Sequence, residues 1–360
     1  AGLLGDMPRL DYSGGATCPS LLLEPSRSNY ATQSEYIGVW SQNDVTGTDN
    51  FATSPEGVKN AAKISASLTS AAHFIQLTGV SVGSLATISL FAKADTGSYI
   101  QLTNPYSGAN FANFDVATGV VGTKGSNCIS SDIEDYGNGW YRCTAVFSFV
   151  GTSHTYRHHI VSSASAPFGQ SWLPASDTSL FIYGHQWESG SYPTSYIPCY
   201  GSASVRGLDA PSISSGSSIF NDNEGTFFLE IEGLSDSSST KVVTIGDGTS
   251  SNRLQIFYQA GTNITTNVIS GGSSQVTGFT TTTDQEQNHK VLIKYASNNA
   301  KMYLDGTEIA SDVSVTPPSG LNVLRFNNGT GAAAFEGEVK QLLYFDTALT
   351  DAECIALTTI

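Results

Sequence analysis

The sequence predicts an all-β protein made of two tandem antiparallel β-sandwich domains, and three observations support this. Short β-rich runs such as HFIQLTGV, WYRCTAVFSFV and HKVLIKYA recur along the chain, each bounded by Gly, Asn, Asp or Ser. No amphipathic helix of useful length separates them, which favours sandwiches over alternating strands and helices. The chain has 360 residues, a length that suits two domains better than one.

The boundary between the two domains is predicted in the stretch 181–210. It opens as a strand at FIY, and Pro193 and Pro198 then exclude a helix. A small polar run, GSASVRG, follows and is typical of a linker. In this stretch we expect Trp187 and Tyr196 to hold the two units together. The resulting division is an N-terminal linker or attachment segment at 1–18, a first domain at 19–205, a linker at 206–212 and a second domain at 213–360.

The composition limits the possible partners. Charged residues make up 13% of the chain, about half the ~25% usual for soluble domains. The net charge is −15 and no basic stripe is present, so we expect no nucleic-acid binding. Anionic membranes and polyanionic substrates are disfavoured for the same reason. No stretch approaches the ~20 apolar residues of a spanning helix, so membrane insertion is not expected.

Local motifs add detail to each domain. In YGNGWYR, the pair Asn138-Gly139 predicts a tight turn, after which Trp140 begins a strand with its ring in the core. In the second domain, Asp305-Gly306 predicts the turn of a hairpin. A single short helix is predicted at 351–357.

Three segments resemble a module that recurs in bacteriophage tail-fibre and head-fibre proteins. They are LLLEPSRSNYATQSEY…VW, DIEDYGNGWYRCTAVFSF and YGHQWESGSYPTSYIP, in this order over residues 19–205. That module is similar to the carbohydrate-binding jelly rolls attached to glycanases. The second domain, with YLDG and VKQLLYFDTALTDAE, resembles laminin-G-like or concanavalin A-like jelly rolls. The resemblance implies two jelly rolls, a virion-surface or extracellular location, other virion proteins as partners and a homo-oligomer, by analogy a trimer.

Aromatic residues of the first domain are the best candidates for ligand binding. Sugar C–H faces stack on aromatic rings, and polar side chains satisfy the hydroxyls. Several aromatic residues fall in or near predicted loops and strand ends, and the alternative for each is a core anchor. Two neighbouring histidines, at 158 and 159, point to opposite faces of a strand and cannot chelate one metal together. The candidate glycan-binding residues are Trp172, Tyr106, Tyr99, Tyr156 and His158, with Phe111 nearby.

The carboxylates of the second domain are the candidates for a catalytic site. Glu230 and Glu232 alternate on one predicted strand and would share a face, as the acid pair of a glycanase would. The strand ends at Gly233 and the third acid of the glycanase pattern is absent. We therefore interpret the pair as solvent-facing on an edge strand and assign no catalytic residue.

No cofactor is assigned, but a structural calcium ion is possible, because jelly rolls often hold one through carboxylates and carbonyls. Polar loops offer Asp44, Asp49 and Asn50 in the first domain, and Asp346 and Asp351 in the second. None of these forms an EF-hand loop, so the ligands of such an ion are not identified.

The five cysteines have no CxxC spacing, so a zinc cluster is not expected. Cys128 with Cys143, and Cys18 with Cys199, could be cross-strand disulfides. The alternative for each is a buried free thiol.

These observations favour a non-enzymatic phage fibre or spike protein that binds cell-surface glycan. Two alternatives stay open: a capsid or tail decoration protein that binds no sugar, and a fragment of a glycan hydrolase or lyase.

Overall fold

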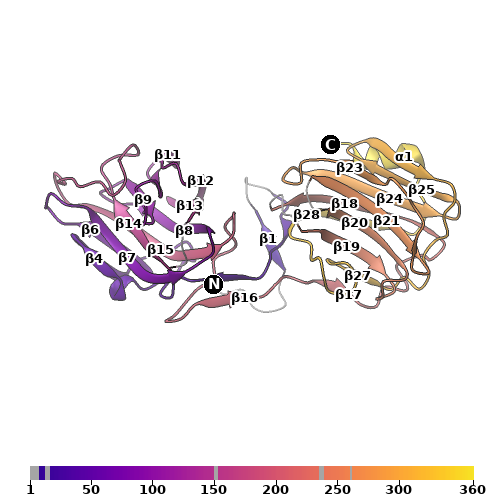
Figure 1. Cartoon of the computed structure of the whole chain (residues 1–360), viewed down its shortest axis with the longest axis horizontal. Coiled ribbons are helices and arrows are strands. Elements are labelled where there is room, and N and C mark those ends of the chain that lie inside the picture. Colours follow the sequence, from indigo (N-terminus) through magenta and orange to yellow (C-terminus); the bar gives the residue numbers. More distant parts are fainter. Residues whose placement is uncertain (1–7, 13–16, 150–152, 235–238, 260–261) are drawn as a thin grey trace. The chain divides into compact units, whose positions relative to one another are not determined.

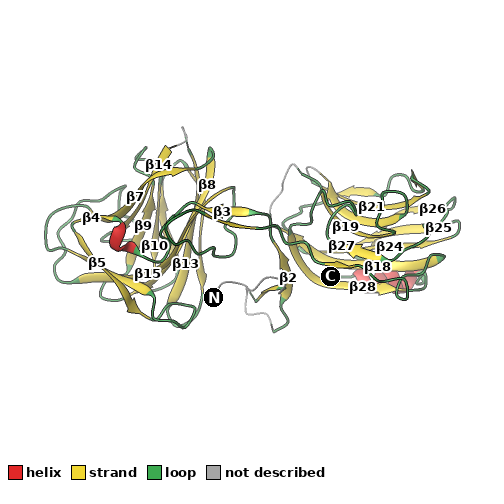
Figure 2. Cartoon of the chain, turned by 90° about the horizontal axis from the view of Figure 1, so that it is seen from below, coloured by secondary structure: helices red, strands yellow, loops and turns green. Residues whose placement is uncertain are grey.

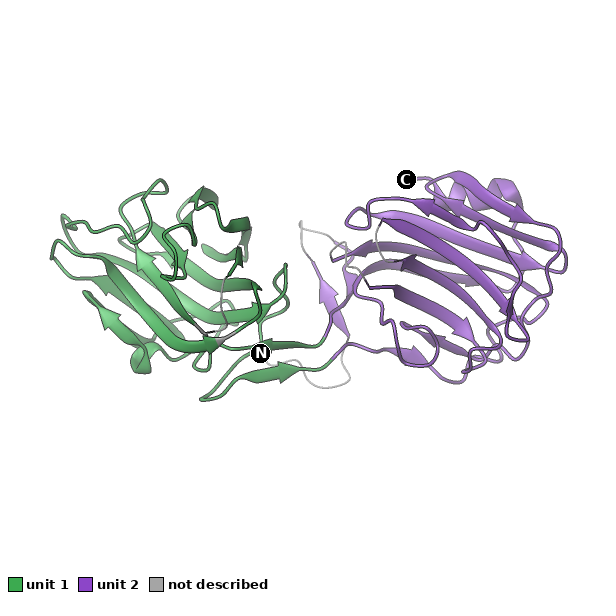
Figure 3. Ribbon diagram, in the orientation of Figure 1, with its two compact units in different colours: residues 1–3, 26–207 green, residues 4–25, 208–360 purple. Residues whose placement is uncertain are grey.

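The computed structural model describes residues 8–12, 17–149, 153–234, 239–259 and 262–360 (Figure 1). The described residues are almost entirely strands and loops, which confirms the all-β prediction (Figure 2). They form two compact units (Figure 3). The first unit contains Ser26–Gly207, and the second combines Leu208–Ile360 with the described residues before Ser26.

The first unit is a sandwich of two antiparallel sheets. Sheet I has the strand order β11-β10-β9-β14-β7-β4, and sheet II has the order β12-β13-β8-β15-β6-β5. Sheet I is built from β4 (Ser41–Asn43), β7 (His73–Ser81), β9 (Tyr99–Thr103), β10 (Phe111–Asp115), β11 (Val120–Lys124) and β14 (Ser153–Ile160). Sheet II is built from β5 (Val45–Ala52), β6 (Ala61–Ala66), β8 (Leu85–Ala94), β12 (Cys128–Asp135), β13 (Trp140–Ser148) and β15 (Thr178–Ser189). A small ribbon pairs β3 (Arg27–Asn29) with β16 (Ser204–Arg206), and a 3-10 turn covers Ile37–Val39.

The second unit is also a sandwich of two antiparallel sheets. Sheet III has the order β1-β2-β28-β18-β24-β25-β26, and sheet IV has the order β17-β27-β19-β20-β21-β22, with β23 on β21. Sheet III is built from β1 (Arg9–Asp11), β2 (Ser20–Leu23), β18 (Glu224–Gly233), β24 (His289–Ala296), β25 (Asn299–Leu304), β26 (Thr307–Asp312) and β28 (Gly337–Phe345). Sheet IV is built from β17 (Ser212–Ile213), β19 (Lys241–Gly246), β20 (Arg253–Gln259), β21 (Asn263–Ser270), β22 (Ser273–Ser274), β23 (Thr280–Thr282) and β27 (Val323–Arg325).

Each unit has its own apolar core between its sheets. In the first unit, Ile75 and Ile100 of sheet I pack with Leu90 and Ile182 of sheet II. A separate cluster in the second unit joins residues of sheets III and IV. Because alternate residues of a strand face opposite sides, these core residues also fix which neighbours face outward.

The structure divides the chain differently from the sequence-based boundaries. β1 and β2 lie outside the first unit and extend sheet III, where Leu21 pairs with Val339 and Leu23 with Gly337 (Figures 1 and 3). Leu23 is buried in the core of the second unit. The run directly precedes the first unit in the sequence, but pairing at the edge of sheet III buries β2 and covers β28.

The predicted local motifs are present. Asn138 and Gly139 have φ of 53° and 77° in the turn before β13. Trp140 is buried, and its indole N–H donates to the Thr53 carbonyl at 3.2 Å. The closing helix α1 spans Asp351–Thr358. It begins at a capping box in which the side chains of Thr350 and Glu353 each bond to the backbone of the other residue.

The expected role of Trp187 and Tyr196 is corrected: both pack within the first unit, Trp187 in its core and Tyr196 on Phe91 of sheet II. The cysteines follow the free-thiol alternative: all five are free, and all except Cys18 are buried. Cys143 opposes Ile133, several residues along the ladder from Cys128, and at ~3.3 Å per residue this offset is too long for a disulfide.

We predict that Leu23→Ala destabilises the second unit by about 2–5 kcal/mol, because it leaves a cavity in that unit's core. All four tryptophans of the chain (Trp40, Trp140, Trp172 and Trp187) lie in the first unit, so their fluorescence reports only that unit. The urea midpoint of unfolding measured by far-ultraviolet circular dichroism should fall, while the midpoint measured by tryptophan fluorescence stays unchanged. Leu22→Ala, on the half-buried outer side of β2, is the matched control and should cost less. A shift of the fluorescence transition instead would place β2 with the first unit.

Candidate functional site

Two of the residues predicted to bind ligand, Tyr156 and His158, are fully buried on the inner side of β14. Tyr156 packs on Trp187 with ring centroids 5.1 Å apart, and His158 stacks on Trp40 at 5.9 Å. Alternation along β14 turns both side chains into the core, so neither offers a surface to a sugar in this structure.

The other predicted residues do not form one site. Tyr106 is 64% exposed in the turn after β9, whereas Tyr99 begins β9 and is half-buried. They therefore lie at opposite ends of the strand. Trp172 is also half-buried and is fixed in place: its indole N–H donates to the Ile160 carbonyl at 3.2 Å. Of the predicted set, Tyr106 is the clearest exposed ring.

The outer face of sheet I carries a better defined group of side chains. The register of β14 with β7 and β9 aligns outward-facing residues in two rows across the sheet. We call these the outer rows. One row consists of Asn43, Phe74, His159, Gln101 and Asn113, and the other of Ser41, Gln76, Arg157, Thr103 and Phe111.

A loop at residues 161–172 covers one end of the outer rows. The Gln101 amide donates to the Pro167 carbonyl at 3.0 Å and accepts from the Gly169 N–H at 2.8 Å. The Asn113 amide donates to the Ala166 carbonyl at 2.7 Å. These two polar side chains are therefore used to hold the loop. Phe74, Gln76 and Arg157 on β7 and β14 make no such bonds and stay partly exposed. His159 of β14 is buried.

Arg157 is the central charged group of this exposed part. Its Nε donates to the Gln76 side-chain oxygen at 2.7 Å, and its guanidinium lies 4.3 Å from the centroid of the Phe74 ring. Both contacts fix the plane of the guanidinium. Within the described residues no carboxylate pairs with Arg157, and partial burial lowers the pKa of its side chain.

Two buried polar side chains flank Arg157 without hydrogen-bond partners in the described protein. They are Thr103, through its hydroxyl oxygen, and His159, through both ring nitrogens. Burial, followed by the charge of Arg157, lowers the pKa of His159 to about 3. His159 is therefore neutral at pH 7, and Arg157 is the one charged side chain in the outer rows.

This arrangement is suited to binding and not to acid–base chemistry. A partly exposed ring, an oriented guanidinium and an amide offer stacking and hydrogen bonds to a polar ligand. The outer rows contain no carboxylate and no paired nucleophile and base, as hydrolysis would require. The sequence indicated the alternation of HFIQLTGV and TYRHHI but not which of the two faces was the outer one.

The carboxylates of the second unit occupy different surroundings from those expected. Glu230 and Glu232 face outward, but β18 lies between β28 and β24 and is not an edge strand. Glu232 forms an ion pair with Lys340 at 2.8 Å, and Glu230 accepts from the Asn288 amide at 3.0 Å. Each carboxylate thus has its own protein partner.

The candidate calcium ligands are largely occupied by protein donors. Asp44 accepts from the Thr69 hydroxyl at 2.8 Å, and Asp49 accepts from the backbone N–H of Ile37 at 2.8 Å. Asp351 forms ion pairs with two lysines, which lower the pKa of its carboxyl. Asn50 lies within β5, where it has φ of 53°, and Asp346 borders a polar pocket of the second unit. In the described part of the chain, no three His, Cys, Asp or Glu side chains gather as a metal site.

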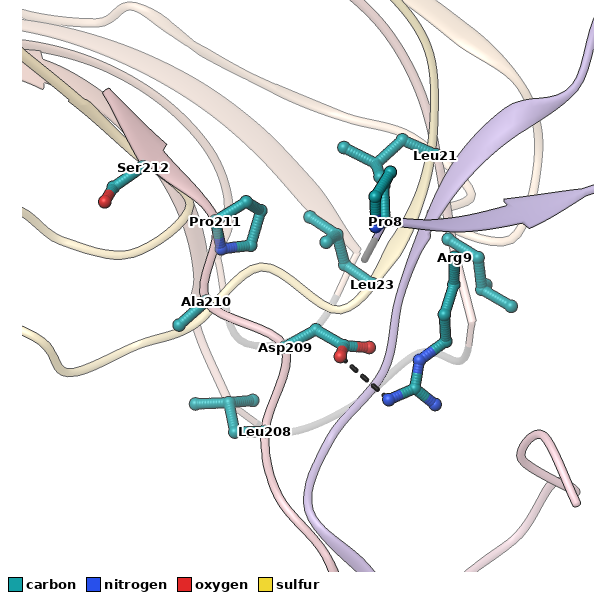
Figure 4. A pocket seen from close by; sticks show the side chains of 10 residues that line it. Pro8, Arg9, Leu21, Leu23, Leu208, Asp209, Ala210, Pro211 and Ser212 are labelled. Atoms are coloured by element: carbon teal, nitrogen blue, oxygen red, sulfur yellow. Dashed lines mark hydrogen bonds and ion pairs between the residues drawn. The ribbon is translucent and has the colours of Figure 1, made fainter. Parts of the chain in front are cut away.

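A pocket of about 480 Å³ lies in the second unit, between the N-terminal hairpin and residues 208–212 (Figure 4). Leucines 21–23 line it, together with the ion pair of Arg9 and Asp209 at 2.9 Å. Arg9 also binds Glu24 at 2.8 Å. The charged groups at this pocket are thus bonded to one another, and they hold the β1–β2 hairpin in place.

Residues 210–354 match the family described as Laminin_G_3, the concanavalin A-like lectin/glucanases superfamily. The second unit therefore has the concanavalin A-like fold that the sequence predicted. No curated protein matches the chain. Among the described residues, no helix is long and apolar enough to cross a bilayer.

Three solved structures are among those to which the chain is similar. The Ruminococcus gnavus IT-sialidase CBM40 bound to alpha2,3 sialyllactose is 18% identical over 39% of this chain and 86% of that chain, with a TM-score of 0.33. The NanB sialidase from Streptococcus pneumoniae is 14% identical over 41% and 26%, with a TM-score of 0.35. The binding domain of Botulinum neurotoxin DC, in complex with rat synaptotagmin II, is 13% identical over 38% and 35%, with a TM-score of 0.30. None of the three assigns a role to a residue of this chain.

We predict that acid destabilises the first unit. A histidine whose folded pKa is depressed stabilises the fold above its unfolded pKa of ~6.5, and this stability is lost as pH falls toward the folded value. Burial lowers the pKa of His185 and His159 to about 3 each, and that of His158 as well. Between pH 7 and pH 5, each such imidazole lowers the free energy of unfolding by about 2 kcal/mol.

The measurement is the free energy of unfolding of the first unit by tryptophan fluorescence at both pH values. His159→Gln should reduce the loss between pH 7 and pH 5 by about 2 kcal/mol. The neighbouring Gln76→Ala, which removes no titrating group, is the control and should leave the loss unchanged. An equal loss in His159→Gln and wild type would show that His159 is protonated in the folded state.

Proposed function

We propose that the first unit binds cell-surface glycan without catalysis, through the outer rows of sheet I. The observation that carries this proposal is the exposed part of the rows, where Phe74, Gln76 and Arg157 are held in one fixed arrangement. A sugar ring stacks its C–H face on an aromatic ring, while amide and guanidinium groups bond to its oxygens.

The location and assembly form part of the same proposal. The low-charge surface, rich in Ser, Thr, Asn and Gly, suits an extracellular protein, and the phage-fibre motifs suggest a fibre or spike on a virion surface. Other virion proteins and a homotrimer are the partners this context implies. Shallow sites bind one glycan weakly, and repeated copies raise the overall affinity.

We predict that Phe74→Ala lowers glycan binding about tenfold, since removing the ring eliminates a stacking contact of about 1.4 kcal/mol. The measurement is binding of multimerised full-length protein to a glycan array and to intact bacterial cells, with the fold checked by circular dichroism.

Tyr200→Ala is the matched control, because Tyr200 is 72% exposed in the same unit but lies outside the outer rows. Tyr106→Ala and Trp172→Ala test the residues that the sequence indicated. If Phe74→Ala binds as wild type while Tyr106→Ala or Trp172→Ala does not, the site lies elsewhere in the first unit. If the wild-type multimer binds no glycan, the alternative of a structural decoration protein is favoured.

A further inference from the structure

We infer that the glycan recognised by the outer rows carries a carboxylate, and that Arg157 is its partner. This inference rests on the proposed function and adds the chemical class of the ligand. The ligand class is an acidic sugar, such as a uronate or sialate residue, set among neutral sugars.

The first argument is the bonding of the guanidinium. Arg157 uses its Nε for Gln76 and one face for Phe74, and no described residue accepts a hydrogen bond from its two terminal nitrogens. Arg142 and Arg253, by contrast, donate through terminal nitrogens to backbone carbonyls at 2.6 and 2.7 Å. The free edge of Arg157 therefore presents two parallel N–H groups, the geometry that binds a carboxylate through both oxygens.

The second argument is the unbalanced local charge. A half-buried arginine is normally neutralised by a carboxylate, and the chain contains 31 acidic residues against 16 basic ones. None of the acidic residues in the described structure pairs with Arg157, and its neighbour His159 is neutral. The positive charge at this site is thus left for a ligand.

The third argument is the presence of buried polar atoms beside the arginine. The Thr103 hydroxyl and both ring nitrogens of His159 lack hydrogen-bond partners within the described chain. Such groups cost about 1–3 kcal/mol each, and folding alone would favour apolar residues at these positions. Both side chains are buried, so they make the surroundings of Arg157 polar but do not themselves face a ligand.

The number of charges limits the kind of acidic glycan. The outer rows offer one cation, and the net charge of −15 repels a densely charged polymer. One carboxylate per recognised segment therefore fits the site, and a polysulfated chain does not.

The test compares acidic oligosaccharides with the same compounds after reduction of their carboxyl groups to alcohols. The probes are uronate- and sialate-containing oligosaccharides, and a sulfated oligosaccharide is a third arm. Binding to the full chain is measured by calorimetry. Wild type should lose roughly 10- to 100-fold in affinity when the carboxyl is reduced, the range of a charge-assisted bond.

Variants of Arg157 separate charge from geometry. Arg157→Gln should bind the acidic and reduced forms equally. Arg157→Lys should keep part of the preference, because it retains the charge without the two-pronged geometry. Gln76→Ala removes the hydrogen-bond partner of the Arg157 Nε without removing charge, and it should weaken the preference for the acidic form. This second variant keeps the test decisive if Arg157→Gln does not fold.

Each outcome decides between the two proposals. Binding of neutral and acidic forms with equal affinity upholds the proposed function and overturns this inference. A preference for the sulfated arm, or a carboxylate preference that survives in Arg157→Gln, also overturns it. The absence of binding to any glycan overturns both.

Discussion

The register of β14 between β7 and β9 is the constraint on which the candidate site depends. It places Tyr156 and His158 against Trp40 and Trp187 in the core, and by alternation it turns Arg157 and His159 to the outer face. The same pairing brings Gln76 beside Arg157 and Phe74 beside His159. A shift of one residue would reverse every one of these positions, so the buried aromatic cluster and the outer rows are two consequences of one pairing.

The two ends of the outer rows are used differently. Toward β9 and β10, Gln101 and Asn113 hold the covering loop through backbone carbonyls, which makes that end part of the fold. Toward β7, Gln76 accepts from Arg157, and Arg157 keeps a charge that no described carboxylate neutralises. The side chains that are left to bind a ligand therefore project from a rigid sheet. A preorganised surface of this kind loses little conformational freedom on binding.

Much of the fold follows from the sequence alone. Alternating apolar runs predicted the strands, Asn138-Gly139 predicted a turn, and the end of the chain predicted α1. The partner of β2 could not be predicted, because Leu21 and Leu23 pair with a strand more than 300 residues away. The site was harder to predict for a similar reason. Alternation in TYRHHI separates two sets of side chains, but only the packing of the opposite sheet decides which set is buried. The sequence pattern therefore indicates aromatic residues such as Tyr156 and gives no signal for Arg157.

The most direct test of the account is a nuclear magnetic resonance titration of the full chain with the oligosaccharide that binds best on an array. The side-chain Nε–H signal of Arg157 is assigned by comparison with Arg157→Lys. The account predicts that this signal and the backbone amides of β7 and β14 shift together, with a common dissociation constant. Shifts confined to the turn at Tyr106, to the surroundings of Tyr200 or to the second unit would contradict the central claim that the outer rows bind the glycan.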